Sequence, residues 1–182
     1  VSRGFELLGE NRVQEFLSKK EHYVKNAEIN FIGHLQSNKI KYIIDSVTMI
    51  QSVDSVSLAK EISARALAKG TVMDILCEVN IGGEESKSGF APEAVYDSVC
   101  EIAVLKGVRV CGLMTIPPPS DSCVYFEKMQ RIFEDMKSRS PENTDISLLS
   151  MGMSADYTEA VRFGTGMVRL GTALFGARNY SI

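Results

Sequence analysis

MDILCEVNIGG, at residues 73–83, is the stretch that decides the fold class. Its first seven positions are almost continuously apolar, which is typical of a strand covered on both faces and therefore of a parallel sheet. The stretch then passes through Asn80 into Gly82 and Gly83, a change to polar and flexible residues that is typical of a strand end near a ligand. This segment predicts an α/β protein.

The same alternation of apolar run and helical spacing repeats along the chain. Asp54 and Ser154 are candidate N-caps for two of the helices, because each precedes a helical pattern with a side-chain acceptor. The candidate strands are residues 5–9, 29–33, 48–53, 73–81, 108–114, 146–151 and 167–170. Apolar residues at helical spacing occupy residues 13–17, 40–44, 58–62, 95–102 and 126–136.

Repeated βα units form either an open doubly wound sheet or a closed barrel, and periodicity does not distinguish the two. Polar and glycine-rich residues follow six of the seven predicted strands, and such a converging ring favours a TIM-type (β/α) barrel. A typical barrel has about 250 residues and eight strands. With 182 residues and seven candidate strands, the chain is about one βα unit short.

Composition restricts the protein class. The chain is 45% hydrophobic and 24% charged with a formal net charge of -3, which is typical of one globular domain, here residues 1–182. Its four cysteines form no CxxC pair, so a reduced, cytoplasmic protein is expected. The sequence contains neither a Lys/Arg block nor an apolar stretch long enough for a bilayer, and no signal peptide is expected. Nucleic-acid and membrane partners are therefore not expected.

Two turns after the last two predicted strands have the composition of a phosphate site. Ser150 and Gly152 lie at the end of one strand, and Gly171 and Thr172 follow the next. Small residues let backbone N–H groups approach an anion, hydroxyls add hydrogen bonds, and the loops after the last strands are the recurring phosphate site of barrels. Tight turns use the same residue types, so this pattern leaves both interpretations open.

Other polar residues also have both a binding and a structural interpretation. Arg169 lies in an apolar strand, where a cation needs either an ion-pair partner or a ligand. Asn11 and Asn80 follow strands and either position a ligand or stabilise a turn. His34 has no second histidine or cysteine at ligand spacing, so no metal site is expected.

Seven motifs, taken in order, closely resemble the pyridoxal phosphate homeostasis protein family over nearly the whole chain. They are GENRVQE (9–15), FIGHLQSNK (31–39), SVDS (52–55), VNIGGEESKSG (79–89), GLMTIPP (112–118), LSMGMS (149–154) and MVRLGTALFGAR (167–178). The resemblance implies an alanine-racemase-like barrel without the second domain of the racemases. It also implies binding of pyridoxal 5′-phosphate (PLP), with no established catalytic turnover.

Carried over to this sequence, the resemblance assigns the residues that bind the cofactor. Arg169 would face the pyridine nitrogen, where a cation keeps the ring unprotonated and suits holding the cofactor better than carbanion chemistry. The implied phosphate ligands are Ser150, Gly171 and Thr172, and the implied ring contacts are Asn11, Asn80 and Met114. Asn30 and Gln51 stand where the family usually has histidine.

The lysine that forms a Schiff base with PLP in the family lies upstream of the Gly-Glu-Asn motif, which begins here at Gly9. That segment would precede Val1, so we expect an N-terminally incomplete barrel without its first strand. We expect weak PLP binding through the phosphate and no specific Schiff base. The family resemblance suggests a monomer, but the two unpaired edges beside a missing strand would promote association.

Two other functions are alternatives. A PLP-dependent amino-acid racemase of this fold needs a second domain to complete its active site. An aldolase-like enzyme with a phosphate site needs a catalytic lysine or a carboxylate pair at the strand ends, where only Glu10 and Glu78 come near.

Overall fold

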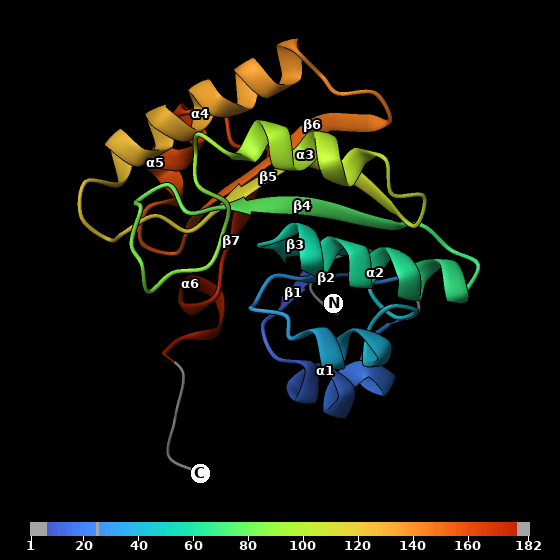
Figure 1. The fold of residues 1–182 in the computed structure, drawn as a ribbon. Coiled ribbons are helices and arrows are strands. Elements are labelled where there is room, and N and C mark those ends of the chain that lie inside the picture. The colour runs from blue at the N-terminus through green and yellow to red at the C-terminus, as the bar shows by residue number, and fades with distance from the viewer. Residues whose placement is uncertain (1–6, 25, 178–182) are drawn as a thin grey trace.

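Strands and helices alternate along residues 7–24 and 26–177, the part of the chain that the computed structural model describes (Figure 1). The strands are β1 Leu7–Glu10, β2 Glu28–Phe31, β3 Met49–Val53, β4 Met73–Val79, β5 Val108–Thr115, β6 Thr144–Met153 and β7 Met167–Arg169. The α-helices are α1 Val13–Lys19, α2 Val56–Ala68, α3 Val95–Ala103, α4 Ser122–Ser138, α5 Tyr157–Arg162 and α6 Thr172–Phe175. All seven predicted strands are confirmed, although residues 5 and 6 of the first lie outside the described residues. None of the described helices has both the length and the apolar character that crossing a bilayer requires.

The strands form one parallel sheet in the order β1-β2-β3-β4-β5-β6-β7. A doubly wound sheet would reverse its strand order at a switch point, and none occurs among the described strands. The Nε2 atom of Gln51 on β3 donates to the Sδ atom of Met167 on β7 at 3.0 Å. In a flat sheet these strands would be about 19 Å apart, at about 4.8 Å per strand. The sheet is therefore curled into a nearly closed barrel, as predicted (Figure 1).

Alternate side chains of each strand face the helices or the barrel interior, because the period of a strand is two. On β4, Ile75, Cys77 and Val79 belong to the main core, which they share with apolar residues of the surrounding helices. Leu76 belongs to a second, smaller cluster with Cys111 and Met114 of β5. The continuous apolar pattern of this strand follows from burial on both faces.

Two local predictions need correction. The N-cap of α2 is Ser55, whose side chain accepts a hydrogen bond from the N–H of Leu58 at 3.2 Å. Asp54, the predicted cap, instead lies 3.4 Å from Nδ1 of His34. The predicted helix at residues 40–44 is a 3₁₀ helix, η2 Ser37–Tyr42, which is followed by turns. A second 3₁₀ helix, η1 Lys20–His22, follows α1.

Gly112 lets β5 and β6 approach closely where their register shifts. Its φ is +150°, and a Cβ atom placed there would lie 1.8 Å from the carbonyl oxygen of Leu148. The position therefore excludes every residue with a side chain unless the backbone moves.

Candidate functional site

Arg169 is the cation at the carboxyl ends of the last strands. Its Nη1 atom donates to Oγ of Ser150 at 2.6 Å, and its Nη2 atom donates to the carbonyl oxygen of Thr115 at 2.7 Å. Burial lowers the pKa of Arg169 to about 10, while the carboxylates of Glu78 and Asp156 oppose this decrease. The guanidinium therefore stays charged at neutral pH, and two strands hold its two terminal nitrogens.

Ser150 and Gln51 extend this contact across the barrel interior. Both side chains are fully buried, on β6 and β3 respectively. Oγ of Ser150 donates to Oε1 of Gln51 at 2.8 Å, and the Gln51 amide donates to Met167. A serine hydroxyl has one proton, which here goes to Gln51. The predicted phosphate ligand Ser150 therefore contacts Arg169 and Gln51 in this structure.

Ser154 connects the turns after β6 and β7. Its Oγ atom accepts hydrogen bonds from the N–H groups of Gly171 and Ala173, each at 3.1 Å. The predicted role of Ser154 as the N-cap of α5 is wrong, because Asp156 occupies that position. Thr172 is exposed at the same turn. Sequence reasoning omitted Ser154 from the site, although a second hydroxyl four residues after Ser150 was a usable signal.

Gly152 has a packing role in this structure. Its φ is +93°, and an added Cβ would lie 2.5 Å from the Cβ atom of Ala160 on α5. This glycine therefore lets α5 lie against the end of β6, beside the turn that contains Ser154.

The predicted ring contacts differ in their surroundings. Met114 is fully buried and pairs in register with Ser150, so it lies beside the Arg169 contacts. Asn80 donates from Nδ2 to the carbonyl oxygens of Glu84 and Lys87, at 2.8 and 3.3 Å, and thereby stabilises its own loop. Asn11 is exposed directly after β1.

The carboxylate of Glu78 lies near the carboxyl end of β4. Burial and the nearby carboxylate of Asp54 raise the pKa of Glu78, whereas Arg169 and His34 act in the opposite direction. In the part of the chain that the structure describes, no three His, Cys, Asp or Glu residues gather as a metal site would require. The partly buried guanidinium of Arg169 supplies positive charge near Glu78.

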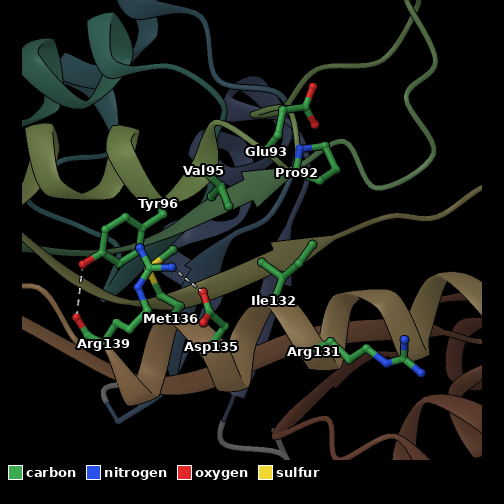
Figure 2. A pocket seen from close by; sticks show the side chains of 9 residues that line it. All are labelled: Pro92, Glu93, Val95, Tyr96, Arg131, Ile132, Asp135, Met136 and Arg139. Atoms are coloured by element: carbon green, nitrogen blue, oxygen red, sulfur yellow. Dashed lines mark hydrogen bonds and ion pairs between the residues drawn. The ribbon is translucent and has the colours of Figure 1, made fainter.

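A groove of about 300 Å³ lies elsewhere, on the helical exterior between α3 and α4 (Figure 2). Val95, Ile132 and Met136 are among its apolar lining. Arg139 lies over the Tyr96 ring with its Cζ atom 3.7 Å from the centroid, and pairs with Asp135 at 2.9 Å. The contact between Arg139 and Tyr96 joins the two helices, and none of the predicted site residues lines the groove.

Known proteins are similar to this chain in sequence and in fold. The family described as alanine racemase, N-terminal domain, matches residues 2–179. The pyridoxal phosphate homeostasis protein of Aquifex aeolicus is 44% identical over 182 residues, covering 97% of this chain and 79% of the relative. PipY of Synechococcus elongatus, solved with PLP bound, has a TM-score of 0.82 and 28% identity, with 92% of this chain and 80% of PipY covered. An alanine racemase of Clostridium difficile shares the fold with a TM-score of 0.76 at 19% identity, over 99% of this chain and 47% of the racemase.

Proposed function

Because the chain belongs to the alanine racemase N-terminal domain family, and within it to the pyridoxal phosphate homeostasis proteins, we propose that it binds PLP and acts in intracellular PLP homeostasis. The observation that carries this proposal is Arg169, a partly buried cation at the carboxyl ends of the strands with both terminal nitrogens held. PipY, which was solved with PLP bound, supports the choice of ligand.

The donor groups at this edge fit the two ends of the cofactor. A pyridine nitrogen accepts a hydrogen bond, and a guanidinium only donates. At the neighbouring turn, the N–H groups of Gly171 and Ala173 converge on the single oxygen of Ser154. Two backbone N–H groups that converge on one oxygen can serve a phosphate oxygen in the same way.

We assign the pyridine nitrogen to Arg169 and the phosphate to the turn of Gly171 and Thr172, with Ser154 beside it. Ser150 then acts on the ligand through Arg169, because its proton is committed to Gln51. Gly152 shapes the end of β6. Met114, Asn80 and Asn11 are the proposed ring contacts.

The proposed role is to hold the cofactor without turnover. Bound PLP supplies an electron sink whose strength depends on protonation of its ring nitrogen. The Arg169 guanidinium carries no acceptor and stays charged at neutral pH, so it donates to this nitrogen and does not protonate it. In the part of the chain that the structure describes, no lysine side chain is buried. The proposed binding therefore rests on the phosphate turn and Arg169.

Titration calorimetry with PLP, and separately with pyridoxal, tests the proposal. Thr172→Val removes one hydroxyl that would bond to a charged phosphate, worth about 1.5 to 3 kcal/mol, and should weaken PLP binding at least tenfold. Pyridoxal has no phosphate, so its affinity should not change in this variant.

Thr158→Val is the matched control, because Thr158 is exposed on α5 and its hydroxyl contacts only Glu159 among the described hydrogen bonds. It should bind PLP as the wild-type protein does. An unchanged PLP dissociation constant in Thr172→Val would contradict the phosphate assignment. The absence of PLP binding by the wild-type chain would contradict the function.

A further inference from the structure

We propose that Gln51 is a positioning residue that determines selectivity for a ligand with a ring-nitrogen acceptor. Gln51 acts through Ser150, whose oxygen receives Nη1 of Arg169. This inference rests on the proposed function and goes beyond it, because it explains how the protein would distinguish a pyridine from a carbocyclic ring of the same shape.

The hydrogen bonds between these side chains run in one direction. Arg169 has no acceptor, so Ser150 must receive the Arg169 proton and direct its own proton to another group. Oε1 of Gln51 lies 2.8 Å from Oγ of Ser150, whereas its Nε2 lies 3.0 Å from the sulfur of Met167. The opposite amide orientation would direct a second donor at Ser150 and leave an oxygen facing a sulfur. The Gln51 carbonyl is therefore the terminal acceptor.

Two groups accept hydrogen bonds from Arg169, and Gln51 orients the one that can rotate, the Ser150 hydroxyl. The other group is the backbone carbonyl of Thr115, which is fixed because Thr115 lies in a strand between two neighbours. A serine side chain can occupy three staggered rotamers about its Cα–Cβ bond, and the hydrogen bond from Ser150 to Gln51 favours the rotamer that accepts from Arg169. Gln51 and Ser150 are both fully buried, so solvent does not readily replace a lost acceptor.

This arrangement predicts a specific change in ligand preference. Wild-type protein should bind PLP more tightly than 1-deazapyridoxal 5′-phosphate, in which CH replaces the ring nitrogen. If Gln51 is lost, Ser150 turns and the guanidinium moves away from the ring nitrogen. The affinity for PLP then decreases while the affinity for the deaza analogue stays the same, because the phosphate contacts are unchanged.

Two Gln51 variants separate the acceptor from the shape of the side chain. Gln51→Met has a similar length and no oxygen, and should reduce the ratio of the two affinities about tenfold, the value of one lost hydrogen bond to a charged group. Gln51→Glu keeps the acceptor for Ser150 but loses the donor to Met167, and should keep the ratio within about twofold of wild type. Gln14→Met, at an exposed position of α1, is the control for a Gln-to-Met change and should match wild type. Far-UV circular dichroism checks the fold of each variant.

Ser150→Ala repeats the test at the intermediate hydroxyl, and supplies it if Gln51→Met does not fold. It should give the same loss, and the Gln51→Met/Ser150→Ala double variant should lose no more than either single variant. An unchanged ratio in Gln51→Met, or an equal loss for both ligands, would overturn the positioning role. A loss in Gln51→Glu equal to that in Gln51→Met would also overturn it. A wild-type protein that binds neither ligand would instead overturn the proposed function.

Discussion

Replacing Arg169 by lysine should destabilise the protein even though the charge is kept. The guanidinium makes two charge-assisted hydrogen bonds, of 2.6 and 2.7 Å, to acceptors on two different strands. An ammonium is a compact point charge and can keep one of these acceptors. The lost bond costs about 1.5 to 3 kcal/mol, which in a protein of this size lowers the melting temperature by about 3 to 12 °C.

Differential scanning calorimetry at neutral pH measures this change. Arg162→Lys is the matched control, because Arg162 is exposed at the end of α5, and its stability should differ from wild type by less than about 0.5 kcal/mol. The reasoning is refuted if Arg169→Lys melts at the same temperature as Arg162→Lys. In that case the two hydrogen bonds would contribute nothing that a lysine cannot replace.

Three further predictions concern the sheet, one carboxylate and the thiols. Gly112→Ala should cost about 3 kcal/mol or more in urea unfolding, because its Cβ would lie 1.8 Å from a backbone oxygen; a loss below about 1 kcal/mol would contradict the close approach. Burial raises the pKa of Glu78, so the folded state holds this proton more tightly than the unfolded chain, and ionisation costs stability as the pH rises above about 4.3. Glu78→Gln should therefore raise the melting temperature more at pH 7 than at pH 4, and an equal change at both would show the sign to be wrong. Burial raises the pKa of Cys77 to about 12, so a maleimide should label exposed Cys123 in the native protein and Cys77 only after denaturation, as peptide mapping would show.

Strand positions and fold class could be predicted from the sequence because they depend on residues that are adjacent in the chain. Each buried strand needs apolar side chains on both faces, and this requirement appears directly as a continuous apolar run such as residues 73–79. Glycine and hydroxyl residues near the ends of the last strands marked the two turns that Ser154 connects. Local capping was less predictable, since Asp54 and Ser55 are both good N-caps and backbone geometry selects Ser55.

The partners of the site residues depended on closure of the barrel. The sequence singled out Arg169 and Ser150 but left their contacts undetermined. These contacts join four strands, and Gln51 on β3 reaches Ser150 on β6 only because the sheet curls. Ser154 looked like a helix cap because its acceptor role toward Gly171 spans two turns that are 17 residues apart. Hydrogen bonds between residues distant in the chain leave no periodic pattern. Tertiary packing therefore decides which polar side chain binds a ligand and which one holds its neighbour in place.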